Sequence, residues 1–143
     1  MQNAAILVVD DEGDFRETLL NRLKKRRILA VGCGSGEEAL ALFRKGERFD
    51  AVILDIKMPG GMDGITTLRE IRAIHPGADV ILLTGHASLE TSLEGMQEGA
   101  FDYLLKPIKL EDLLEKLAQV LDRKGTAEHR AQSEEIRRML EKR

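Results

Sequence analysis

Five polar residues stand where apolar segments of the sequence end. Asp10 and Asp11 follow the first segment and Asp55 follows the third, whereas Thr84 and Lys106 follow the fourth and fifth. Carboxylates that lie close together repel one another unless they share a proton or hold a cation. Oxygen ligands suit Mg²⁺, and a hydroxyl and an ammonium can bind the oxygens of an anion. Because a carboxylate can also act as a nucleophile, these residues could together hold Mg²⁺ and a phosphoryl group.

The five polar residues converge only if the apolar segments form one sheet. The segments are short, rich in Val, Ile and Leu, and continuous rather than alternating, which is typical of strands covered on both faces. They span residues 4–9, 28–31, 51–54, 80–83 and 101–105. Amphipathic helical patterns lie between them, and one of these is the stripe formed by Leu89, Leu93 and Met96. A capping box at residues 35–38 predicts the start of the second helix.

This alternation predicts an α/β fold, a five-stranded parallel sheet with helices on both faces. Right-handed crossovers favour the flavodoxin-like strand order 2-1-3-4-5, which reverses between the first and third strands. Neighbouring strands lie ~4.8 Å apart, so we expect Asp11 and Asp55 to be near neighbours. Asp55 is the best candidate nucleophile because it comes alone from the central strand, whereas Asp10 and Asp11 form a pair suited to a metal ion.

Length and composition restrict the protein class. The chain has 143 residues, a net charge of −3 and 3% aromatic residues, which argues against direct binding of nucleic acid. Its one cysteine, Cys33, follows the second predicted strand and excludes a disulfide framework. No apolar run approaches the ~18–20 residues of a membrane span, and no secretory signal is evident. We therefore expect a cytoplasmic protein.

The sequence predicts a long domain followed by a short C-terminal extension. Residues 1–122 form the α/β domain, and residues 123–143 form a charged helical extension or linker, mostly exposed to solvent, that continues the last helix. Whether this extension frays or forms part of a coiled coil stays open. A basic cluster at residues 22–27 is explained by solvation and by the dipole of the first helix.

Four motifs resemble those of the receiver domains of two-component response regulators. The motifs occupy residues 7–12, 54–59, 83–85 and 103–107. They occur in the family's order at the predicted strand ends, and the resemblance covers roughly residues 4–122. Each motif alone is weak evidence, but the four together are highly specific.

The resemblance implies that Asp55 accepts a phosphoryl group. The donor would be a phosphohistidine of a sensor histidine kinase or of a phosphotransfer protein. The metal ligands would be Asp10, Asp11 and Asp55, with the backbone carbonyl of Lys57 as a further ligand to Mg²⁺. Such a protein catalyses its own phosphorylation and slow dephosphorylation and is not a turnover enzyme.

The resemblance also implies a conformational switch. Thr84 and Lys106 would bind the phosphoryl oxygens, Tyr103 would move inward when Thr84 is drawn to the phosphoryl group, and the peptide bond between Lys106 and Pro107 would be cis. The output surface would be the fourth helix, fifth strand and fifth helix, within residues 85–121. Binding of a partner or formation of a homodimer is expected there.

The sequence departs from the family pattern in two places. The loop at residues 58–64 has one extra glycine, and Ile108 follows Pro107 where an aromatic residue is common. Two variable positions, Lys57 and His86, lie two residues beyond Asp55 and Thr84. We hypothesise that both side chains restrict the water that would hydrolyse a phosphoaspartate.

Two alternative functions stay open at this point. A haloacid-dehalogenase-type phosphatase also uses an aspartate nucleophile and Mg²⁺, but it requires an Asp-x-Asp motif that is missing after the first strand. An adaptor with the same fold would bind its partner without phosphorylation, and the complete acidic set argues against it.

Overall fold

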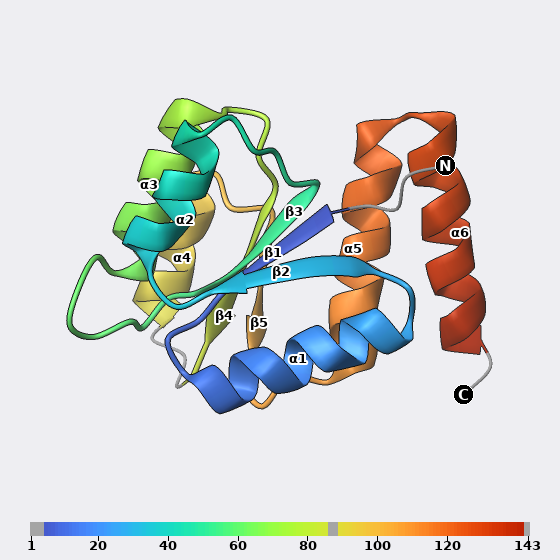
Figure 1. Cartoon of the computed structure of the whole chain (residues 1–143), viewed down its shortest axis with the longest axis horizontal. Helices are drawn as coiled ribbons and strands as arrows, with labels where there is room; N and C mark the ends of the chain where they lie inside the picture. The colour runs from blue at the N-terminus through green and yellow to red at the C-terminus, as the bar shows by residue number, and fades with distance from the viewer. Residues whose placement is uncertain (1–4, 86–88, 142–143) are drawn as a thin grey trace.

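The computed structural model of the protein describes residues 5–85 and 89–141. Its centre is a parallel sheet in which the strands pair in the order β2-β1-β3-β4-β5 (Figure 1). The strands are β1 (Ala5–Val9), β2 (Leu29–Cys33), β3 (Ala51–Asp55), β4 (Val80–Thr84) and β5 (Asp102–Leu105). The fold class and the strand order predicted from the sequence are confirmed.

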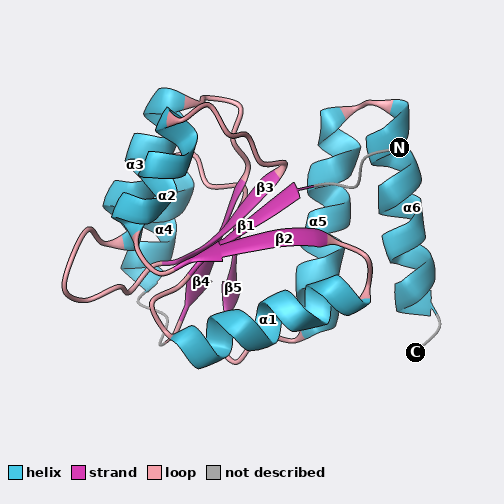
Figure 2. Ribbon diagram, viewed as in Figure 1, coloured by secondary structure: helices cyan, strands magenta, loops and turns pink. Residues whose placement is uncertain are grey.

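Helices cover both faces of the sheet. They are α1 (Gly13–Lys25), α2 (Gly36–Arg44), α3 (Gly64–Ile74), α4 (Leu89–Gln97), α5 (Leu110–Lys124) and α6 (Ala127–Glu141). Figure 2 shows α2, α3 and α4 on one side of the strands and α1 and α5 on the other. The predicted capping box is confirmed, because the side chain of Ser35 accepts a hydrogen bond from the backbone N–H of Glu38.

The central strands explain the continuous apolar runs in the sequence. Every residue of β3 and β4 is buried. In β3, Val52 and Leu54 pack in the cluster with α2 and α3, and Ile53 packs in the cluster with α1 and α5. Successive side chains of a strand point to opposite faces, so a strand covered on both faces must be apolar throughout.

The edge strand β2 differs from the prediction. It runs to Cys33, so this cysteine ends the strand instead of following it. Leu29 and Val31 are 56% and 45% exposed, and the expected coverage on both faces is therefore wrong for β2. No strand within residues 5–85 and 89–141 pairs with its outer edge, so burial falls there although the sequence stays apolar.

Two members of the apolar stripe of α4 also point away from the core. Leu93 is 53% exposed and Met96 is 37% exposed, whereas Ser92 is buried. A Cβ on Gly95 would overlap the side chain of Leu82, so α4 approaches β4 through its small residues. Helical periodicity alone could not distinguish an apolar face on the core from one on the surface.

The C-terminal extension is helical, as expected, but it does not continue α5. α5 ends at Lys124, and the next residue, Gly125, has a φ of 77° that allows the chain to reverse. α6 then returns along α5 (Figure 1). Ile136 is 1% exposed and belongs to the same core cluster as α1 and α5. The expectation that the extension continues the last helix is therefore wrong, because the chain reverses at Gly125. Most residues of α6 are exposed or half-buried, but one face of the helix completes the core.

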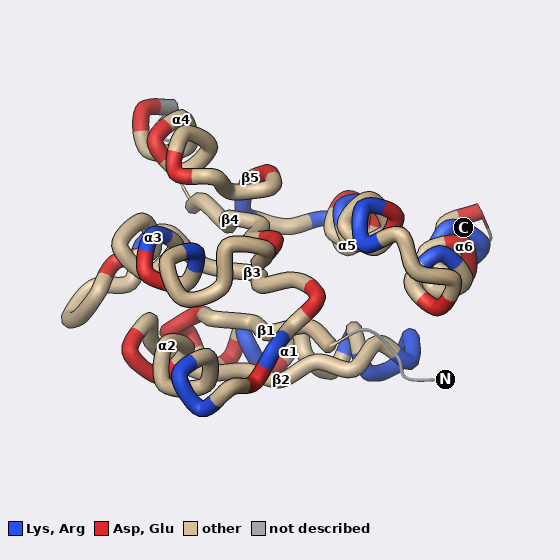
Figure 3. The backbone as a smooth tube through the Cα atoms, turned by 90° about the horizontal axis from the view of Figure 1, so that it is seen from above, with Lys and Arg blue, Asp and Glu red and all other residues tan. Residues whose placement is uncertain are grey.

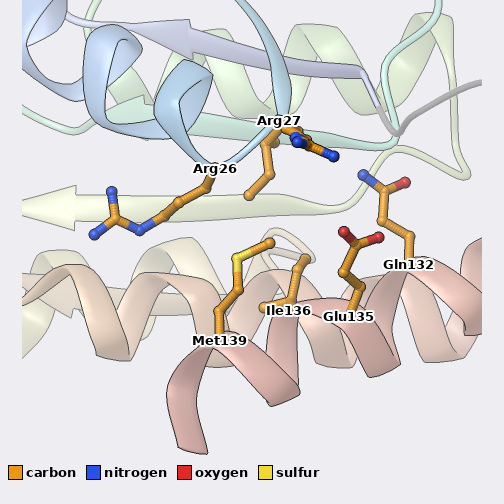
Figure 4. Close-up of a pocket in the computed structure, with 7 residues that line it drawn as sticks. Arg26, Arg27, Gln132, Glu135, Ile136 and Met139 are labelled. Carbon is orange, nitrogen blue, oxygen red and sulfur yellow. The ribbon is translucent and has the colours of Figure 1, made fainter. Parts of the chain in front are cut away.

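Polar contacts anchor α6 along its length. Ser133 and Arg137 donate hydrogen bonds to Asp122 at 2.6 and 2.7 Å, and these bonds lower the pKa of the Asp122 carboxyl, with Arg137 as the larger cause. His129 Nε2 lies 2.8 Å from Oδ1 of Asp50, the residue that immediately precedes β3. Figure 4 shows Arg26 opposite α6, across a cavity of about 200 Å³.

None of the helices in residues 5–85 and 89–141 combines the length and the apolar character that a membrane span requires.

Candidate functional site

Three carboxylates meet at the carboxyl edge of the sheet. Asp10 follows β1 and is completely buried, Asp11 is exposed beside it, and Asp55 ends β3 at 3% exposure. One oxygen from each carboxylate can be chosen such that all three lie within 4.8 Å of one another. The expected proximity of Asp11 and Asp55 is confirmed, because β1 and β3 are parallel neighbours that end at the same edge.

This cluster fits a small divalent cation. Three carboxylate oxygens lie close enough together to share one cation, and the residue of one of them, Asp11, is exposed, which leaves room for the waters that Mg²⁺ retains. Two buried carboxylates next to a third require compensation by a proton or by positive charge. Asp10, Asp11 and Asp55 are therefore suited to hold Mg²⁺.

Lys106 supplies a positive charge from the next loop. Its Nζ lies 3.0 Å from Asp10 Oδ2, 3.5 Å from Asp55 Oδ2 and 3.6 Å from Glu12 Oε1. Burial lowers the pKa of Lys106, but the hydrogen bond to Asp10 and the nearby negative charges outweigh burial and raise it. Lys106 therefore stays protonated and partly neutralises the acidic cluster.

The environment of Asp55 disfavours its charged form. Burial is the largest cause, followed by the charge of Asp10, and together they raise the pKa of Asp55 from 3.8 to about 6 despite the opposing effect of Lys106. The backbone N–H of Lys57 donates to Asp55 Oδ1 at 3.2 Å. Asp55 is thus ionised at neutral pH but lacks full compensation of its charge.

Thr84 ends β4 and is 5% exposed. Within the described part of the chain, its Oγ1 has no hydrogen-bond partner, which is costly for a buried hydroxyl. Thr84 also lines a groove of about 530 Å³ between the β3–α3 loop and the start of α4, next to Ile56 and Met58. The hydroxyl is thus available to a group that enters beside Asp55.

The remaining predicted residues are distributed around this edge. Tyr103 lies on β5, is half-buried and packs against the cluster between the sheet and α2 and α3. The bond between Lys106 and Pro107 is cis, as the resemblance implied. Lys57 is exposed beside the acidic cluster, whereas His86 lies outside the described residues.

The loop with the extra glycine is closed at its base and tied at its tip. The backbone N–H of Gly64 donates to the carbonyl of Ile56 at 2.9 Å, and a Cβ on Gly64 would collide with the backbone of Asp55 and Ile56. At the tip, Glu37 of α2 accepts a hydrogen bond from the N–H of Met62 at 3.2 Å. The loop therefore has a defined conformation that keeps it beside Asp55.

Two residues next to the site could not be identified as its neighbours from the sequence, where only a helical pattern was visible. The Lys106 ammonium lies 4.4 Å from the centre of the Phe15 ring, a cation–π contact. Arg16 donates from Nη1 to the carbonyl of Asp10 at 2.8 Å. Both residues come from the first turn of α1, which reaches the site because it follows β1 directly.

Comparison with known proteins shows which protein family this chain is similar to. The model of the response regulator receiver domain matches residues 6–118. The transcriptional regulatory protein ZraR of Escherichia coli K12 is 38% identical over 119 residues, which cover 83% of this chain and 26% of ZraR. The DNA-binding transcriptional regulator NtrC of Salmonella typhimurium is 36% identical over 112 residues, with 78% and 24% covered. The chain thus spans about a quarter of the length of these relatives.

Solved structures agree with the family match. A response regulator receiver domain protein from Clostridium thermocellum has a TM-score of 0.79 and 38% identity, covering 85% of this chain and 96% of that one. A structure described as an adenylate cyclase from Rhodopirellula baltica has a TM-score of 0.73 and 30% identity, covering 99% and 95%. A receiver domain is not a turnover enzyme, so the phosphatase alternative is discarded. The chain belongs to the response regulator receiver domains of two-component signalling.

Proposed function

We propose that this receiver domain accepts a phosphoryl group on Asp55 from the phosphohistidine of a sensor histidine kinase or of a phosphotransfer protein. One observation carries the proposal. Asp55 is a buried, incompletely compensated carboxylate that lies close to the carboxylates of Asp10 and Asp11 and to the ammonium of Lys106. The reaction depends on Mg²⁺, for which Asp10, Asp11, Asp55 and the carbonyl of Lys57 are the proposed ligands.

The transfer is a nucleophilic substitution at phosphorus. A carboxylate oxygen of Asp55 forms the new O–P bond while the P–N bond to the donor histidine breaks, and the released imidazole nitrogen takes up a proton. The ammonium of Lys106, 3.5 Å from Asp55 Oδ2, is placed to bind a phosphoryl oxygen. Bound Mg²⁺ would supply further positive charge to these oxygens.

Phosphorylation is proposed to act through Thr84. Its hydroxyl, which has no partner among the described residues, would donate to a phosphoryl oxygen and move toward Asp55. Tyr103, half-buried on the adjacent strand β5, would turn inward as Thr84 withdraws. A change from a mostly inactive to a mostly active population requires ~5.5 kcal/mol of differential stabilisation.

The proposed output surface is the face formed by α4, β5 and α5. Three exposed apolar side chains lie on this face, those of Leu93, Met96 and Leu105. A group of exposed apolar side chains marks a contact surface more often than a single exposed side chain does. We propose that a homodimer or a partner protein forms here after phosphorylation. ZraR and NtrC are described as transcriptional regulators, and if this domain is part of a longer chain, it would control the attached domain.

Direct binding of nucleic acid by the receiver domain itself is not proposed. The proposed compartment is the cytoplasm, since the lone thiol of Cys33 suits a reducing setting.

The acceptor is tested with a small acyl phosphate and MgCl₂. Intact-mass spectrometry should show the addition of one phosphoryl group, peptide mapping should place it on Asp55, and the Asp55→Asn variant should stay unmodified. Absence of the mass gain in folded wild-type protein with Mg²⁺ present would refute the proposal. Identical binding of the physiological partner by wild type and Asp55→Asn would instead favour the adaptor.

Two further measurements test the switch and the hydrolysis. Phosphorylation should alter amide exchange between residues 89 and 121 and the mass in solution, and no change in either would exclude this output face. Lys57→Ala and His86→Ala should shorten the lifetime of the phosphoaspartate, and an unchanged lifetime would exclude the shielding role of these side chains.

A further inference from the structure

Lys106 contacts an aromatic ring as well as carboxylates. Its Nζ lies over the ring of Phe15, 4.4 Å from the ring centre, and the same nitrogen lies 3.0 Å from Asp10 Oδ2 and 3.5 Å from Asp55 Oδ2. The face of an aromatic ring is negative and attracts a cation, most strongly where water is scarce. Because the Lys106 side chain is only 16% exposed, this attraction is effective and holds the ammonium within reach of Asp55.

The ring differs from the carboxylates in two respects. Asp10 and Asp55 are also the proposed ligands of Mg²⁺, so their oxygens would be shared between two cations, whereas a hard metal ion prefers oxygen and does not compete for a ring face. Glu12 Oε1 lies 3.6 Å from the Lys106 nitrogen, but its side chain is 69% exposed and attracts the ammonium toward solvent. Phe15 therefore attracts the ammonium inward and keeps this effect when a metal ion binds.

The core fixes the position of the Phe15 ring. Phe15 is the third residue of α1, is half-buried, and packs against the core cluster that lies between the sheet and α1 and α5. Ile108, two residues after Lys106, packs against the same cluster. Phe15 and Ile108 line a cavity of only about 40 Å³, which leaves the ring little room to turn. The ring is thus a fixed support beside a flexible lysine side chain.

We propose that Phe15 is a positioning residue for phosphoryl transfer, whose ring keeps the Lys106 ammonium beside Asp55 while the phosphoryl group arrives. The inference rests on the proposed function of Asp55 as the acceptor. An ammonium has three N–H donors, and the contact with the ring face does not use them up. Lys106 can therefore exchange a carboxylate oxygen for a phosphoryl oxygen without leaving the site, and Phe15 acts through Lys106.

Phe15→Leu is the first test, because leucine keeps an apolar side chain in the core but has no ring. With a small acyl phosphate and MgCl₂, this variant should become phosphorylated on Asp55 about fivefold more slowly than the wild type, since the ammonium then moves toward Glu12 and solvent. Phe15→Tyr keeps the ring and should stay within about twofold of the wild-type rate. Equal rates for Phe15→Leu and the wild type would overturn the inference, whereas a wild type that does not react would refute the proposed acceptor itself.

The chain offers a matched control for the loss of a ring. The ring of Phe101 lies 5.1 Å from the Arg123 guanidinium, a contact of the same kind. Arg123 belongs to the basic last turn of α5 (Figure 3), at the other end of this helix from the loop that carries Lys106. Phe101→Leu should therefore leave the rate of phosphorylation unchanged, and a loss equal to that of Phe15→Leu would contradict a specific role of Phe15.

A double-mutant cycle separates positioning from a structural role. Lys106→Met removes the ammonium, keeps a side chain of similar length, and should slow phosphorylation by itself. In this background Phe15→Leu should have almost no further effect, because its effect passes through the ammonium. The same loss in both backgrounds would show that Phe15 acts through packing alone and would overturn the inference.

Two measurements examine the ring contact directly. In the metal-free protein without a phosphodonor, the ring current of Phe15 should shift the NMR signals of the Lys106 ε-methylene protons upfield, and Phe15→Leu should abolish this shift. Fluorinated phenylalanines at position 15 keep the shape of the ring but weaken its negative face, so the rate of phosphorylation should fall stepwise with each added fluorine. Unshifted signals in the wild type, or a rate that does not depend on fluorination, would contradict the proposal.

Discussion

Replacement of the proposed phosphoacceptor should stabilise the metal-free protein. The Asp55→Asn substitution removes a buried negative charge next to Asp10 but keeps an oxygen that can accept from the N–H of Lys57. The move of the Asp55 pKa from 3.8 to about 6 corresponds to about 3 kcal/mol at ~1.36 kcal/mol per pH unit. Screening by nearby solvent reduces the expected gain to about 2 kcal/mol.

The pH dependence of this gain has a definite sign. The folded protein holds the Asp55 proton to a higher pH than the unfolded chain does. The wild type therefore has its full share of stability below about pH 4 and loses it as the pH rises through about 6. The stability difference between Asp55→Asn and wild type should accordingly be small at about pH 4 and reach its full value at about pH 7.5.

Urea unfolding in EDTA at several pH values measures this difference. Added Mg²⁺ should reduce the difference in unfolding free energy between Asp55→Asn and the wild type at about pH 7.5. The wild type offers three carboxylates to the cation, whereas the variant offers two. The control Asp112→Asn removes an exposed carboxylate from α5 and should not increase stability. If Asp55→Asn is no more stable than wild type without metal, or if the gain does not vary with pH, the electrostatic account of the site is wrong.

Three further substitutions test separate parts of the structure. Thr84→Val removes a buried hydroxyl that has no partner among the described residues. Thermal melting should show an unfolding free energy about 1 kcal/mol higher than that of the wild type. Amide exchange should show a weaker response to phosphorylation. Gly64→Ala should lower the unfolding free energy by about 2 kcal/mol and slow phosphorylation, because its Cβ would collide with the backbone of Asp55; equal melting temperatures would refute this. Ile136→Ala should lower the free energy of unfolding by about 2 kcal/mol, because it leaves a cavity between α5 and α6. Glu134→Ala on the exposed face of α6 should change the free energy of unfolding in urea by less than ~0.5 kcal/mol. Similar losses for the two variants would show that α6 does not complete the core.

The chemistry at the edge of the sheet was largely predictable from the sequence. Parallel strands that alternate with helices all end on one edge, so the polar residues that follow the first, third, fourth and fifth apolar segments could be expected to converge without coordinates. The convergence of Asp10, Asp11, Asp55 and Lys106 follows this rule.

Surface placement was less predictable. The stripe of Leu93 and Met96 has the same period as a core face, yet it is exposed, because Gly95 lets α4 approach the sheet on another side. The apolar sequence of β2 likewise indicated two covered faces, whereas its edge position leaves Leu29 and Val31 exposed. Periodicity reports which residues share a face, but not what that face meets.

The sequence by itself thus determined the fold class, the strand order and the residues that share the carboxyl edge, since these depend on local pattern and chain direction. Only the tertiary structure decided that Lys106 bonds to Asp10, that burial raises the pKa of Asp55, and that α6 folds back to bury Ile136. Each of these depends on distances and solvent access between residues far apart in the chain, and local pattern contains no information about them.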